Sequence, residues 1–135
     1  MAGRPGGPGD MADRDPWTVE RANAALPRVG AALERIRELV ASARQEREES
    51  SGLLEGNGHP PAPRAADELR TVVEELTGEG IVLRDLDAGL VDFPARLGDG
   101  RPYLLCWVLG EPAVEWWHWP ETGFAGRRPL SDPPA

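Results

Sequence analysis

Residues 89–130 read GLVDFPARLGDGRPYLLCWVLGEPAVEWWHWPETGFAGRRPL, and this stretch decides the fold of the chain. It contains four of the five tryptophans, the tyrosine, both phenylalanines, the single cysteine and one of the two histidines. Short runs of β-branched and aromatic residues alternate here with Gly, Pro and Asp, a pattern typical of strands joined by turns. We therefore expect a small antiparallel sheet, and any functional site, in this part of the chain.

Four short strands are expected, at residues 81–83, 90–93, 103–109 and 113–119. The last two form a hairpin across a turn that ends in Pro112. The order of short strands without intervening helices indicates an antiparallel sheet.

The loop length of the 103–119 hairpin decides which side chains share a face. A loop of three residues places Cys106 opposite Trp116 and Leu104 opposite His118, so that Cys106 and His118 are diagonal neighbours on one face. A loop of two residues places Cys106 opposite Glu115 and moves His118 to the other face. The sequence leaves both registers open, because a slip of one residue exchanges them.

The residues before the sheet predict two helices. Thr18 is the expected N-cap of the first helix, which should stop near Leu26, kink or restart at Pro27, and continue through Arg47. Apolar residues spaced four, three and four apart form one stripe along it. These residues are Val29, Leu33, Ile36 and Val40.

A second helix is expected over residues 65–77, joined to the first by a Gly- and Pro-rich linker at residues 50–64. The two helices should form an antiparallel hairpin. The stripe on the first helix is longer than the second helix can cover. We therefore expect a protein partner, most simply a second copy in a homodimer.

The chain has room for one α+β domain, in which an N-terminal antiparallel helical hairpin packs with a small C-terminal antiparallel β-sheet. The ends are rich in Gly and Pro and offer no periodic apolar face, so they are expected to be disordered tails. The expected boundaries are a tail at 1–15, the domain at 16–130 with its helical part at 16–80 and its β part at 81–130, and a tail at 131–135.

Composition excludes several classes of protein. The formal net charge is −8, and all 15 basic residues are arginine. The acidity argues against nucleic-acid binding and against adsorption to an anionic membrane. No run approaches the ~20 apolar residues of a membrane-spanning helix, and the first residues lack the apolar segment of a signal peptide. One cysteine allows no internal disulfide, so we expect a soluble, cytoplasmic protein.

Several motifs resemble a bacterial family known as domain of unknown function 2203 (DUF2203). They are WTVERANAALP at 17–27, GLVDFP at 89–94, GR at 100–101, LCW at 105–107, GE at 110–111, WH at 117–118 and GFAGR at 123–127. The resemblance covers most of the chain from Trp17 to Leu130 and supports the α+β architecture. It implies no activity.

Cys106, His118 and Glu111 are the candidate catalytic residues. A thiolate at Cys106 with His118 as its base is one interpretation. A buried structural cysteine beside a hydrogen-bonded histidine is the other, and we favour it because cysteine is among the most buried residue types.

Ligands for a metal are few. His118, Asp92, Glu111, Glu115 and Glu121 could contribute, but only one of the two histidines is a credible ligand. A catalytic metal usually needs three protein ligands. We therefore expect no metal and no cofactor.

The candidate binding residues are Arg101, Trp107, Trp117 and Arg127. The glycine-flanked segment before Arg127 could bind an anion, whereas the favoured interpretation is an ion pair of Arg127 with Glu111, or with Asp92 instead. The tryptophans fall on both faces of the hairpin, so some should form an exposed apolar patch.

The sequence assigns no specific function. The leading hypothesis is a small non-enzymatic module for protein interaction or regulation, which uses the helical stripe and the tryptophan-rich sheet. The alternative is a small-ligand- or anion-binding domain, or an enzyme, with a Cys/His/Glu/Arg site in residues 89–130. Burial of His118 and Glu111 separates the two hypotheses, because a functional site should gather them at one polar pocket.

Overall fold

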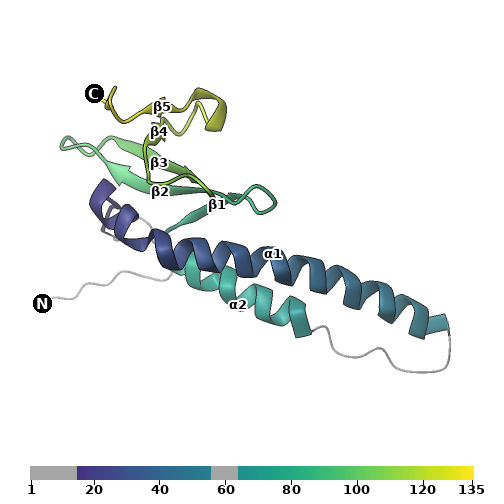
Figure 1. The fold of residues 1–135 in the computed structure, drawn as a ribbon. Coiled ribbons are helices and arrows are strands. Elements are labelled where there is room, and N and C mark those ends of the chain that lie inside the picture. The colour runs from purple at the N-terminus through teal and green to yellow at the C-terminus, as the bar shows by residue number, and fades with distance from the viewer. Residues whose placement is uncertain (1–14, 56–63) are drawn as a thin grey trace, which may run out of the picture.

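A computed structural model describes residues 15–55 and 64–135 of the chain. Two helices and a five-stranded antiparallel sheet form the α+β fold that the sequence predicts (Figure 1). The expected tail up to residue 14 and residues 56–63 of the expected linker lie outside the described residues. Within the described residues, no helix is both long and apolar enough to span a membrane.

Neighbouring strands in the sequence are neighbours in the sheet, in the order β1-β2-β3-β4-β5. The expected strands are all present with shifted ends, and the short strand β5 was not predicted. The elements are α1 (Val19–Glu55), α2 (Arg64–Gly78), β1 (Val82–Asp85), β2 (Leu90–Arg96), β3 (Pro102–Val108), β4 (Trp116–His118), the short 3₁₀ helix η2 (Phe124–Gly126) and β5 (Arg128–Pro129).

Helix α1 begins as predicted, because the Thr18 hydroxyl accepts a hydrogen bond from the backbone N–H of Arg21 (3.1 Å). The predicted break at Pro27 is wrong, since α1 runs without interruption to Glu55. Pro27 is exposed, and the buried face of α1 continues on both sides of it. Packing of that face against the sheet outweighs the local cost of proline. The expected linker therefore begins after Glu55 rather than at residue 50.

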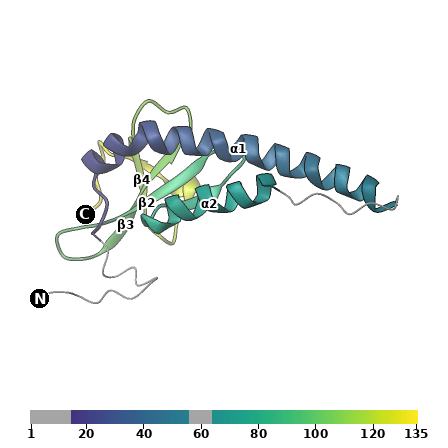
Figure 2. The same cartoon turned by 90° about the horizontal axis from the view of Figure 1, so that it is seen from below.

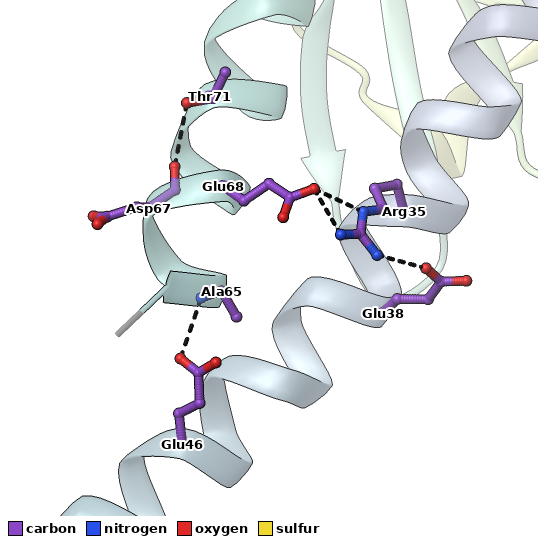
Figure 3. Close-up of polar contacts among 7 residues, drawn as sticks. All are labelled: Arg35, Glu38, Glu46, Ala65, Asp67, Glu68 and Thr71. Carbon is purple, nitrogen blue, oxygen red and sulfur yellow. Dashed lines mark hydrogen bonds and ion pairs between the residues drawn. The ribbon is translucent and has the colours of Figure 1, made fainter. Parts of the chain in front are cut away.

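The two helices lie side by side in an antiparallel hairpin (Figure 2). At the start of α2, the Glu46 carboxylate accepts a hydrogen bond from the backbone N–H of Ala65 (3.1 Å). This N–H has no partner within its own helix, so Glu46 caps α2 from α1. Arg35 joins the helices again through Glu68 (2.6 Å) and also contacts Glu38 on its own helix (Figure 3).

The apolar stripe of α1 is covered by the same chain. Val29, Leu33 and Ile36 are buried in the core with residues of α2 and the sheet, and Val40 is partly buried against it. The C-terminal half of α1 extends past the sheet (Figure 1). A homodimer stays a prediction, and the stripe gives it no free surface.

Strand β3 pairs with β4 in the register of the three-residue loop, with Leu104 opposite His118 and Cys106 opposite Trp116. Strand β4 is shorter than predicted, because the N–H of Val114 donates to the side chain of Asn23 on α1 (2.8 Å) instead of to a neighbouring strand. One face of the sheet therefore packs on α1, and the other carries Cys106 and His118.

The C-terminal segment covers the second face, on the side of the sheet away from the helices (Figure 1). The indole N–H of buried Trp117 donates to the backbone carbonyl of Asp132 (2.8 Å). The contact attaches the chain beyond Leu130 to the core, which runs against the expectation that residues 131–135 are a disordered tail.

Removal of residues 131–135 should lower the stability of the domain. It leaves the buried indole N–H of Trp117 without its acceptor, which costs about 1–3 kcal/mol and should lower the melting temperature by roughly 3–10 °C. A chain that ends at Pro133 keeps the acceptor and should melt like the full chain. Differential scanning calorimetry measures the melting temperatures of both truncated chains. Equal melting temperatures would contradict a stabilising contact between Trp117 and Asp132.

Candidate functional site

Three polar side chains meet on the sheet face that points away from the helices. Asp92 lies on β2, Cys106 on β3 and His118 on β4, and one donor atom from each lies within 4.8 Å of the others. The strand register brings them together, because Asp92 lies opposite Cys106 and His118 is the diagonal neighbour of Cys106. All three are buried, with Asp92 only 1% and His118 only 2% exposed.

A pocket of about 190 Å³ opens beside this cluster. Its lining residues are Arg84, Leu90, Asp92, His118, Pro120, Gly123 and Phe124. Segment 120–124, which returns the chain from β4 toward β5, supplies one wall. Gly123 has φ of 67°, a backbone conformation that suits glycine, and this residue leads the chain into η2.

The hydrogen bonds of His118 determine where its protons lie. Its Nδ1 lies 2.7 Å from the backbone carbonyl oxygen of Trp119, and a carbonyl oxygen only accepts, so Nδ1 carries a hydrogen. Its Nε2 lies 3.0 Å from Oδ2 of Asp92, which also accepts. Two acceptors cannot face each other at that distance, so a proton or another cation must lie between them.

The Asp92 carboxylate is unevenly satisfied. Its Oδ2 also accepts a hydrogen bond from Nε of Arg84 (2.7 Å). Its Oδ1 is buried and has no hydrogen-bond partner among the described residues. A buried polar atom without a hydrogen-bond partner raises the free energy of the folded state. Such atoms are rare in native structures.

Cys106 is not an activated nucleophile in this arrangement. Burial, followed by the negative charge of Asp92, raises the pKa of its thiol to about 12, and the nearby Arg127 only partly opposes this effect. At neutral pH the group is therefore a thiol. Nε2 of His118 contacts Asp92, and its Nδ1 contacts a carbonyl oxygen, so the interpretation of Cys106 as a nucleophile with His118 as its base finds no support here.

The predicted ion pair of Glu111 with Arg127 is confirmed. Two hydrogen bonds join the guanidinium and the carboxylate (2.8 and 3.3 Å). The side chain of Arg127 is 18% exposed and that of Glu111 is 21% exposed. The Glu111 carboxylate also accepts from the N–H of Val108 (2.9 Å). Arg127 lies against the rings of Trp116 and Phe124, 4.5 Å from each ring centroid. Its guanidinium is therefore already engaged.

The other candidate binding residues lie outside the pocket lining. Trp107 and Trp117 are buried in the core. Arg101 is exposed and stacks on the ring of Trp119, 3.8 Å from its centroid. The prediction of an exposed patch of tryptophans is wrong. Among the described residues, Phe124 is the only large hydrophobic side chain that is exposed.

Arg84 and Phe124 were missed by the sequence analysis, although both line the pocket. A charged residue directly after the apolar run 81–83 was the available signal for Arg84, and its meaning depends on the pairing of β1 with β2. Of the expected metal ligands, Asp92 and His118 meet as described. Glu115 and Glu121 are exposed and lie outside the cluster.

A protein-family model described as "Uncharacterized conserved protein (DUF2203)" matches residues 16–130. The match spans the motifs on which the resemblance was based. No similar curated protein and no similar solved structure was found.

Glu111→Gln and Arg127→Gln should each destabilise the domain by about 1–3 kcal/mol, because each leaves a partly buried charge without its partner. The double variant should lose less than the sum of the two single losses. The bidentate pair of Arg28 with Glu79 is a matched control, with side chains 56% and 36% exposed. Its removal should cost below about 1 kcal/mol. Urea unfolding measures all of these losses, and additive, near-zero losses at Glu111 and Arg127 would contradict the pairing.

Cys106 should react slowly with a disulfide reagent at neutral pH in protein that was purified with a chelator. The side chain is buried and its pKa is about 12, so little thiolate is accessible. Labelling in denaturant should be faster by several orders of magnitude. Fast labelling of the folded chain would contradict both the burial and the raised pKa.

Proposed function

The chain belongs to the DUF2203 family of uncharacterised conserved proteins, whose activity is unknown, and we propose that its domain binds a small anionic compound in the pocket between Arg84 and Phe124. This is the ligand-binding alternative of the sequence analysis, moved to a different arginine. The free guanidinium edge of Arg84 carries the proposal.

The guanidinium of Arg84 has hydrogen-bond donors that can bind a ligand. Only its Nε is engaged, by Asp92, and the two terminal nitrogens have no hydrogen-bond partner among the described residues. The side chain is 44% exposed and lines the pocket. A guanidinium in this state suits a carboxylate or a phosphate, which can accept two parallel hydrogen bonds.

The charge around the pocket also favours an anion. Asp92 is the only carboxylate in the lining, and Arg84 balances it. The cation required between Nε2 of His118 and Asp92 then leaves this group net positive, within a chain of formal net charge −8. A local positive charge in an acidic protein raises the local concentration of small anions.

The size and the wall of the pocket narrow the choice of ligand. The pocket volume of about 190 Å³ lies below the roughly 300–1,000 Å³ typical of sites for drug-sized ligands, so the pocket suits a small metabolite. Phe124, which is 46% exposed, offers an apolar surface beside Arg84. A small carboxylic acid with an apolar or aromatic part matches both walls.

The criterion of one shared polar pocket is met only in part, because His118 lines the pocket whereas Glu111 pairs with Arg127 instead. The interaction-module hypothesis still has less support. It relied on exposed tryptophans and on an uncovered helical stripe, and both sets of side chains are occupied within the single chain. A homodimer or another protein partner stays a prediction, as does the absence of nucleic-acid and membrane partners. A cytoplasmic location belongs to this proposal as well, and the single cysteine supports it.

The test is a thermal shift of the full chain with benzoate, with benzamide as its neutral analogue. Benzoate at about 100 times its Kd should stabilise the native state by ~2.7 kcal/mol, because a ligand that binds only that state shifts unfolding. Benzamide should have little effect. Phosphate and acetate, tested in parallel, separate the charged group from the apolar part.

Arg84→Gln should abolish the benzoate shift. Arg70→Gln is the matched control, because Arg70 is an exposed arginine on α2 that contacts only Asp67 by ion pairing. It should keep the full shift. An unchanged shift in Arg84→Gln, an equal shift with benzamide, or no shift with any of the three anions would overturn the proposal.

A further inference from the structure

We propose that Asp92, Cys106 and His118 bind one divalent transition-metal ion, with zinc as the best fit, at the base of the pocket. This inference revises the expectation of no metal, which did not count Cys106 among the ligands. It does not rest on the anion proposal, because it uses different atoms and contacts.

The donor atoms suit zinc in type, number and spacing. Zinc binds thiolate sulfur, imidazole nitrogen and carboxylate oxygen, and non-structural sites often use three protein ligands with an open fourth position. The Asp92, Cys106 and His118 donor atoms lie within 4.8 Å of one another. Two ligands at tetrahedral positions around zinc are about 3.3 Å apart, and Nε2 of His118 lies 3.0 Å from Oδ2 of Asp92.

The orientation of His118 is that of a metal ligand. A ligating histidine commonly donates its other ring N–H to a backbone carbonyl, which fixes the ring and the tautomer. His118 donates Nδ1–H to the carbonyl oxygen of Trp119 and turns Nε2 toward Asp92. A metal ion bound by Nε2 and by the Asp92 carboxylate supplies the positive charge that these two groups require.

The second observation is the vacant hydrogen-bonding capacity of Asp92. Its Oδ1 is buried and has no partner among the described residues, in a side chain that is 1% exposed. A metal ion would satisfy this oxygen. Arg84 would then act as an outer partner of the ligating carboxylate through its hydrogen bond to Oδ2.

The charges balance when the metal binds. As the metal binds, the Cys106 thiol proton and the proton between Nε2 of His118 and Asp92 both leave to solvent, so a thiolate and the Asp92 carboxylate together carry two negative charges. A divalent ion neutralises both, so the buried ligands are not left with an uncompensated negative charge. The three ligands lie on adjacent strands of one sheet, which keeps them on the same face.

The pocket leaves room for a fourth ligand of the metal that does not come from the protein. His118 and Asp92 line the pocket together with Arg84, so a water molecule or an anion there can reach the metal. Zinc would thus add a Lewis acid beside the arginine.

The experiment adds Co²⁺ to the full-length chain after treatment with a chelator. Cys106 is the only cysteine, so a near-ultraviolet thiolate-to-cobalt charge-transfer band can come from no other residue of the chain. We expect this band to saturate at one equivalent, together with the visible bands of tetrahedral cobalt. Zn²⁺ should then displace the cobalt and remove both.

Cys106→Ser should lose the charge-transfer band, and His118→Gln should weaken Co²⁺ binding by more than about 100-fold, since even outer partners of metal ligands contribute 10–100-fold. Glu115→Gln, an exposed carboxylate on the same hairpin, and His59→Gln, the second histidine of the chain, are matched controls that should bind as the natural chain does. Circular dichroism without metal checks that each variant folds.

Absence of the charge-transfer band in the natural chain would overturn the metal site, and so would its persistence in Cys106→Ser. These results need only the natural chain or a cysteine-to-serine change, so a His118 variant that fails to fold does not block the test. A cobalt band without a thermal shift from benzoate, phosphate or acetate would overturn the anion proposal alone, whereas a benzoate shift in metal-free protein without a cobalt band would overturn the metal site alone.

Discussion

The pairing of β3 with both of its neighbours is the constraint on which the rest of the structure depends. Side chains alternate along a strand, so one register divides β3 between two environments. Leu105 and Trp107 face α1 and belong to the core, whereas Cys106 lies on the opposite face beside Asp92 and His118. A slip of one residue between β3 and β4 would separate Cys106 from His118 and place a histidine in the core.

The polar cluster is largely buried because the C-terminal segment folds back over it. The outer face of a sheet packed on helices is normally exposed to water, and here Asp92 and His118 are almost completely buried. Arg127 holds the cover in place through Glu111, at the end of the neighbouring hairpin, and through its contact with Trp116. A partly buried, bidentate pair is a stronger attachment than the exposed ion pairs between the helices.

The sequence predicted the elements better than it predicted the site. Apolar periodicity revealed both helices and most of the sheet, but it could not show that α1 continues through Pro27 without a break. The Glu111–Arg127 pair was predictable because both ends of the contact were turns with known directions. The meeting of Asp92 with Cys106 and the role of Arg84 were not, since they depend on the pairing of β2 with β3 and β1, which no local pattern determines.

The energetics of the cluster of Asp92, Cys106 and His118 favour a functional role over a purely structural one. Buried ionic groups contribute little net stability, because the cost of removing them from water offsets their attraction, and well-packed apolar residues of similar volume often serve the fold equally well. A cluster that existed for stability should at least satisfy all of its polar atoms, yet Oδ1 of Asp92 has no partner among the described residues. The core on the helix side of the sheet is apolar and supplies the stability. The cluster on the other side has the vacant oxygen that the proposed metal ion would occupy.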